Sequence, residues 1–203
     1  MDVPTAAPDR LARALAAVDA ANADDPHTIV VDGHERPKEQ AHAELMTHWV
    51  RTLAPDCGDE QLIAARAHHL RRWALPRDDY PRDRAGYLRW RTALRRRHAD
   101  DVAAIMREAG YDDDAVERVQ AIVRKQGLGR DPEVQVHEDA LCLVFLQTQL
   151  DDLAAQIGDE DKMLAILRKT AGKMSPAALA AAEALPLTPA GAALLGRALA
   201  PTA

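Results

Sequence analysis

Apolar residues recur along the 203-residue chain at the three- and four-residue spacing of amphipathic helices, and no run alternates convincingly with period two. The first such segment, RLARALAAVDAANA, follows Asp9 as its N-cap and places Leu11, Leu15 and Val18 on one face. Acidic residues and a proline end it at 24–26. Since alanine, leucine and arginine dominate and glycine is scarce, the pattern predicts an all-α fold.

Further helices follow with the same spacing, and Pro176 and Pro189 are placed as helix-start residues in the C-terminal part. The one weak strand signal, HTIVVDGHERP, predicts a short hairpin or an ordered loop over a site, with a solvent-facing connector as the alternative. We predict a single compact multi-helix domain, with 9–171 as its core and 172–203 as packing helices. The other expected helices cover about 38–54, 59–74, 83–109 with its continuity left open, 113–126 and 132–157.

Charge is spread unevenly along the chain, whose net charge is −6. Residues 61–100 hold eleven arginines against four aspartates, so this window carries +7 and the rest of the chain −13. The acidic remainder and the shortness of the basic window disfavour nucleic acid as a partner. No membrane partner is expected either, because no apolar run reaches the roughly 18 residues of a membrane span.

The N-terminal stretch and the cysteines bear on the compartment. MDVPTAAPDR lacks the basic and apolar regions of a leader, so we expect a cytoplasmic protein. Cys57 and Cys142 are unrelated in spacing, and Cys142 lies in the apolar run ALCLVFL. We therefore expect reduced thiols and no disulfide.

Histidines on several predicted helices are the first candidates for chemistry. His98 starts a helical segment that continues as AAIMREAGY, and LIAARAHHLRRW carries the adjacent pair His68 and His69. These segments resemble the His-Asp (HD) superfamily of helical metal-dependent phosphohydrolases, in which successive helices supply metal ligands. Adjacent residues of a helix point about 100° apart, so one of the pair is expected to face a site, and the pattern leaves open which one.

The resemblance implies ligands on two more helices. AHAELMTHWV supplies Glu44 and His48 on one face, with His42 as a third option, and HEDALCLVFL offers Asp139, with Glu138 as the adjacent alternative. Two carboxylates and two imidazoles suit one divalent transition metal, Mn, Fe, Zn or Ni. The implied ligands are Glu44, His69, His98 and Asp139.

The chain departs from the superfamily pattern at two places. The aspartate of the HD pair is absent, and Lys125 stands where catalytic members often have another histidine. Both departures disfavour a two-metal centre.

The segment RRWALPRDDYPRDRAGYLRWR combines arginines with aromatic residues. Guanidinium groups suit phosphate or carboxylate, and Trp or Tyr rings stack on them. The alternative is a structural network in which Arg84 and Arg91 pair with nearby aspartates and the aromatic residues pack in the core. The residues predicted to bind an anionic substrate are Arg66, Arg72, Arg84, Tyr87, Arg91 and Lys125.

This segment also carries a closer family resemblance. AARAHHLRRWALPRDDYPRDRAGYLRWR, HEDALCLVFLQ and ILRKTAGKMS are similar to the family called domain of unknown function 4202, over roughly residues 9–180. The resemblance implies that His69 is the functional imidazole of the pair. It implies no activity.

The function expected from these features is hydrolysis of a small phosphorylated or otherwise anionic compound with one bound divalent metal. An HD-type iron oxygenase acting on a small anionic substrate is an alternative, because the same ligands could serve it. A second alternative is a non-catalytic module that binds or senses an anion, which the missing HD aspartate favours. The sequence leaves the oligomeric state open.

Overall fold

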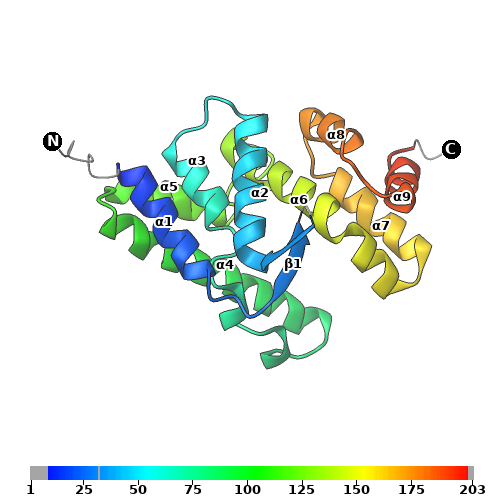
Figure 1. Ribbon diagram of the computed structural model, residues 1–203, viewed down its shortest axis with the longest axis horizontal. Helices are drawn as coiled ribbons and strands as arrows, with labels where there is room; N and C mark the ends of the chain where they lie inside the picture. Colours follow the sequence, from blue (N-terminus) through cyan, green and yellow to red (C-terminus); the bar gives the residue numbers. More distant parts are fainter. Residues whose placement is uncertain (1–8, 32, 201–203) are drawn as a thin grey trace. The chain divides into compact units, whose positions relative to one another are not determined.

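The computed structural model describes residues 9–31 and 33–200 (Figure 1). Helices carry most of the described residues, beside one two-stranded sheet, which confirms the predicted all-α class. The chain divides into two compact units. The first comprises the described residues up to Glu44 together with Cys57–Gln126, and the second comprises Leu45–Asp56 together with the described residues from Gly127 onward. The single-domain description stays a prediction. Over the described residues, no helix has both the length and the apolar character needed to cross a membrane.

The first unit is a set of packed helices with a small hairpin. Helices α1 and α5 each pack against both α3 and α4. Asp9, Asp83 and Asp112 cap α1, α4 and α5 by accepting a hydrogen bond from a backbone N–H of the first turn, which fixes where each helix begins. The elements are α1 (Arg10–Asn22), β1 (Thr28–Val31), β2 (His34–Pro37), the start of α2 (Lys38–Leu53), α3 (Asp59–Arg66), the short 3-10 helices η1 (Arg72–Ala74) and η2 (Arg77–Asp79), α4 (Arg84–Glu108) and α5 (Asp113–Val123).

The weak strand signal is a true hairpin. Strands β1 and β2 pair antiparallel, with Thr28 opposite Pro37 and Val31 opposite His34. Gly33, in the turn between the two strands, has a φ of 78°, a left-handed conformation that glycine adopts without strain. Because β2 leads directly into α2, the hairpin fixes where that helix starts.

The helix expected over 59–74 is shorter, since α3 ends at Arg66. Beyond it the backbone bonds connect residues three apart, as from His68 N to Ala65 O and from Leu70 N to Ala67 O. Arg71 takes a left-handed φ of 49°, and its N–H donates to the side chain of Asn22 at 2.9 Å. This contact with α1 is invisible in the local sequence, and it holds His68 and His69 in a turn instead of a regular helix.

Helix α4 is continuous, which settles the open question over 83–109. His98 lies in its interior, so the prediction that His98 starts a helical segment is wrong. The cap that begins this helix is Asp83, fifteen residues earlier in the chain.

The second unit contains a long helix, three shorter ones and the C-terminal part of α2. Pro132, Pro176 and Pro189 each stand in the first turn of a helix, as predicted for the last two. The apolar core includes Leu143, Leu146, Leu150 and Leu167, and Cys142 lies in it as a free thiol. The helices are α6 (Pro132–Ile157), α7 (Glu160–Ala171), α8 (Pro176–Glu183) and α9 (Pro189–Leu199).

Candidate metal centre

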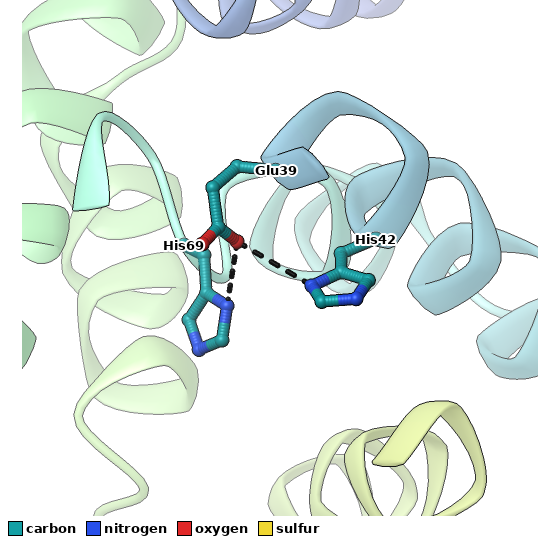
Figure 2. A group of neighbouring side chains, drawn as sticks. All are labelled: Glu39, His42 and His69. Carbon is teal, nitrogen blue, oxygen red and sulfur yellow. Dashed lines mark hydrogen bonds and ion pairs between the residues drawn. The ribbon is translucent and has the colours of Figure 1, made fainter. Parts of the chain in front are cut away.

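A carboxylate and two imidazoles meet in the first unit. Glu39 lies in the first turn of α2, His42 lies one turn further along the same helix, and His69 comes from the turn after α3 (Figure 2). Glu39 Oε2 is 2.8 Å from Nδ1 of His69 and 3.5 Å from Nδ1 of His42. One donor atom from each residue lies within 4.8 Å of the other two. The two rings therefore present their Nδ1 atoms to the same carboxylate oxygen.

Local structure places Glu39 at this point. The carboxylate of Asp25, which is itself buried, accepts from the backbone N–H of Glu39 at 2.9 Å and from that of His27 at 3.0 Å. Lys38 N donates to His27 O, so the segment before β1 is tied to the first turn of α2. Since Glu39 and His42 are three residues apart on a helix, their side chains share one face.

Burial and hydrogen bonding set the protonation of the group. Burial alone would raise the pKa of Glu39, but the charge of His69 and hydrogen bonds from His42 and His69 together lower it well below its usual range. Burial lowers the pKa of His69 to about 4, and the Arg72 charge adds to this, although Glu39 acts in the opposite direction. Near neutral pH the group therefore holds an ionised carboxylate beside a neutral His69.

Arg72 closes the other side of His69. Its Nη1 lies 2.8 Å from His69 Nε2, and its Nε lies 3.9 Å from Glu39 Oε1. Arginine can only donate, so Nε2 of the neutral ring is the acceptor, and the ring proton sits on Nδ1 and points to Glu39. The guanidinium also lies over the ring of Trp90, with its carbon 5.1 Å from the centroid.

His98 is the next histidine in this part of the unit. Its ring centroid is 6.1 Å from that of His69 and its side chain is buried. Its Nδ1 donates to Leu70 O at 2.8 Å, while its Nε2 has no hydrogen-bond partner among the described residues. Burial lowers the pKa of His98 to about 3, so this nitrogen carries a bare lone pair. The ring centroid of His68 lies 4.1 Å from that of His69.

The structure brings together only part of the predicted ligand set. Among the described residues, the carboxylate that shares the close group with His69 is Glu39, whereas both oxygens of Glu44 accept from Arg36, at 2.6 and 2.7 Å. Asp139 belongs to the second unit, where its Oδ1 accepts from Ser175 N at 2.9 Å. Its role as a ligand stays a prediction, as does that of Glu44.

The predicted anion-binding residues differ in their engagement. Arg66 donates twice to the Asp19 carboxylate, at 2.6 and 2.7 Å, so its fork already has a partner. Arg91 lies over the half-exposed ring of Tyr87, with 5.7 Å between its guanidinium carbon and the centroid. Lys125 lies two residues beyond the end of α5 and has a left-handed φ of 59°. Arg84 is the first residue of α4 and is exposed. Of the six, Arg72 is the one that contacts the Glu39 group.

Sequence reasoning missed Glu39 and ranked His42 only as a third option. The signal was present, because a carboxylate three residues before a histidine in the first turn of a helix places both on one face. Glu44 and His48 offered the equally good four-residue spacing. Nothing in the local sequence shows that Arg36, on the preceding strand, forms an ion pair with Glu44.

The fold and the site together define this chain as an all-α protein with a buried carboxylate–imidazole group. The family model described as domain of unknown function (DUF4202) matches residues 12–195, and the chain belongs to this family. No curated protein and no solved structure matches the chain. The family resemblance is thus confirmed, while the resemblance to the HD superfamily stays a prediction. Since the family description states no activity, a proposal about function depends on the chemistry of the site.

Proposed function

We propose that Glu39, His42 and His69 bind one divalent transition metal and that the protein is a metal-dependent hydrolase of a small phosphorylated or otherwise anionic compound. The observation that carries the proposal is the convergence of two Nδ1 atoms on one buried carboxylate oxygen. One oxygen and two nitrogen donors suit Mn, Fe, Zn or Ni.

The donors fit a metal in charge and number. Metal ligation requires an ionised carboxylate and neutral imidazoles, and Glu39 and His69 are in these forms near neutral pH. Three protein ligands leave coordination positions for water and substrate, as in catalytic sites. A bound divalent ion supplies Lewis acidity, which polarises a phosphoryl oxygen and lowers the pKa of a coordinated water.

The surrounding residues have separate parts in this scheme. Arg72 supplies a positive charge beside the group for an anionic substrate. His98 offers an acceptor nitrogen held in one tautomer by Leu70 O, which suits it to accept a hydrogen bond from a water or a substrate hydroxyl. Burial of Glu39 and His42 excludes bulk water from the donors and strengthens their electrostatic interactions.

Elemental analysis of protein purified without an affinity tag tests the proposal. We expect about one equivalent of metal per wild-type chain, lost in Glu39→Gln and His69→Ala and retained in the matched control Glu44→Gln. Circular dichroism confirms that each variant is folded. Metal that stays in E39Q and leaves in E44Q would instead support the ligand set implied by the HD resemblance. A wild-type chain that binds no added metal would refute the proposal.

The metal found also decides between the two enzyme alternatives. Bound iron, together with oxygen consumption in the presence of a small anionic compound, would favour the HD-type oxygenase. Zinc, manganese or nickel would leave hydrolysis as the proposed reaction, to be tested on phosphate monoesters.

A metal-free anion-binding module is the second candidate. It is favoured by the satisfied hydrogen bonding of His69, whose two nitrogens face Glu39 and Arg72. A folded chain that binds inorganic phosphate with equal affinity in the presence and absence of metal would support this function over the enzyme.

A further inference from the structure

Arg72 is held by the same two residues that would ligate the metal. Its guanidinium donates to Nε2 of His69 at 2.8 Å and lies 3.9 Å from Glu39 Oε1. Its side chain is about one third exposed (34%), so it has room to move toward solvent. The nearby Arg77 also lies over Trp90, at 5.9 Å, but it donates to the carbonyls of Tyr80 and Pro81. Of these two arginines, Arg72 is the one whose hydrogen bonds depend on the candidate metal centre.

Metal binding and the Arg72 contacts exclude each other for a simple reason. A metal on Nδ1 of His69 displaces the proton that now points to Glu39, and the neutral ring must carry its one proton on Nε2. Nε2 then donates and no longer accepts, so it opposes the N–H groups of Arg72. The metal also neutralises the Glu39 carboxylate, which removes the second attraction. The ring keeps one proton throughout, and the guanidinium stays charged.

Trp90 keeps the released guanidinium near the site. Its ring is almost fully buried and its Nε1 donates to Leu75 O at 2.9 Å, so the indole is fixed. With one face of the guanidinium on this ring, the edge N–H groups of Arg72 remain for a ligand. A planar fork of donors matches two oxygens of a phosphate.

We propose that Arg72 is the oxyanion-binding residue of this site and that it becomes available only when metal occupies Glu39, His42 and His69. This inference rests on the proposed metal centre and goes further, because it names a phosphate-class ligand and an order of binding, with metal first and anion second. Arg72 thus contacts His69 and Glu39 when metal is absent and contacts the anion when metal is bound.

Calorimetric titration of inorganic phosphate into the full chain tests the proposal. The metal found by elemental analysis is titrated first, without phosphate. We expect the metal-loaded wild type to bind phosphate at least about tenfold more tightly than the metal-free protein. Arg72→Gln should keep its metal and lose at least about tenfold in phosphate affinity. Exposed Arg89 on α4 provides the matched control, R89Q, which should behave as wild type.

Each other outcome overturns a defined step. Equal phosphate affinity with and without metal refutes the release of Arg72, and wild-type phosphate affinity in metal-loaded R72Q refutes its role as the anion contact. If no metal binds in the first titration, the metal centre and this inference fall together, and that result is known before any phosphate is added.

The tautomer of His69 gives a second readout that needs no Arg72 variant. Long-range ¹H–¹⁵N correlation spectra of wild-type protein, with His69 assigned from the spectrum of His69→Gln, report which ring nitrogen carries the proton. We expect Nδ1–H in the metal-free protein and Nε2–H after loading with Zn²⁺. A metal-loaded ring with no proton on Nε2 would refute the mechanism of release.

Discussion

Replacing Gly86, near the start of α4, is predicted to destabilise the fold because a backbone carbonyl occupies the space that a side chain would take. A Cβ built at this position would lie 2.1 Å from the carbonyl oxygen of Pro81 and 2.8 Å from its carbonyl carbon. The N–H of Gly86 donates to the capping carboxylate of Asp83 at 2.6 Å. The segment over 76–83, part of the arginine and aromatic region, is thus packed directly against the first turn of the helix.

The size of the effect follows from this geometry. In Gly86→Ala, the Pro81 carbonyl and the new Cβ must separate by about 0.9 Å to reach even 3.0 Å, the limit that real contacts respect. Overpacking of this kind costs about 1–3 kcal/mol, and disturbing the Asp83 cap adds about 1 kcal/mol. The better helix propensity of alanine offsets about 1 kcal/mol. We therefore expect a net loss of about 2 kcal/mol in the free energy of unfolding.

Urea unfolding followed by far-ultraviolet circular dichroism measures this loss. Gly196, inside α9, is the matched control because a Cβ there meets nothing within 4 Å. Gly196→Ala should leave stability unchanged or raise it by up to about 1 kcal/mol. The two glycines belong to different units, so each transition is fitted separately. A G86A protein as stable as wild type would refute the reasoning from the close approach.

Two further predictions concern the residues around the candidate centre. Asp25→Ala removes the acceptor for Glu39 N and should cost about 1–2 kcal/mol in urea unfolding and weaken metal binding, whereas the exposed neighbour variant Asp24→Ala should do neither. The hydrogen bond from Arg36 holds the pKa of Glu44 below its usual value. The ionised carboxylate therefore stabilises the fold at pH values above the ordinary glutamate pKa of about 4.3. This stabilisation is lost as the pH falls through the lower pKa of the folded state. Glu44→Gln should therefore be less stable than wild type by about 0.5–1 kcal/mol at pH 7, a difference that shrinks toward acid pH. A gap that stays constant with pH would contradict this assignment.

Helix starts were the part of the fold most open to prediction from sequence. Asp9, Pro132, Pro176 and Pro189 signal their own positions, because a cap or a proline acts within one turn of the chain. The end of α3 carries no such signal. It depends on Asn22, which comes from α1 and accepts from the backbone of the left-handed Arg71.

The candidate site was predictable in kind and only partly in membership. His69 and His98 stood out by residue type, and the structure places their rings 6.1 Å apart. The choice between Glu39 and Glu44 could not be made locally, since each precedes a histidine by three or four residues on the same helix. It is decided by Arg36 on β2, which pairs with Glu44, and by Asp25, which fixes the backbone of Glu39.

The basic window over 61–100 illustrates why charge alone is a weak guide to ligand binding. Arg66 is paired with Asp19, Arg82 with Asp78, and Arg77 donates to backbone carbonyls, so these three already have partners inside the protein. An arginine committed to a carboxylate or a carbonyl must lose that contact before it can hold a phosphate, which costs most of what the new contact supplies. Arg72 differs because its partners are residues that a metal would claim. In the proposed arrangement, metal binding breaks the present contacts of Arg72, so the anion does not have to break them.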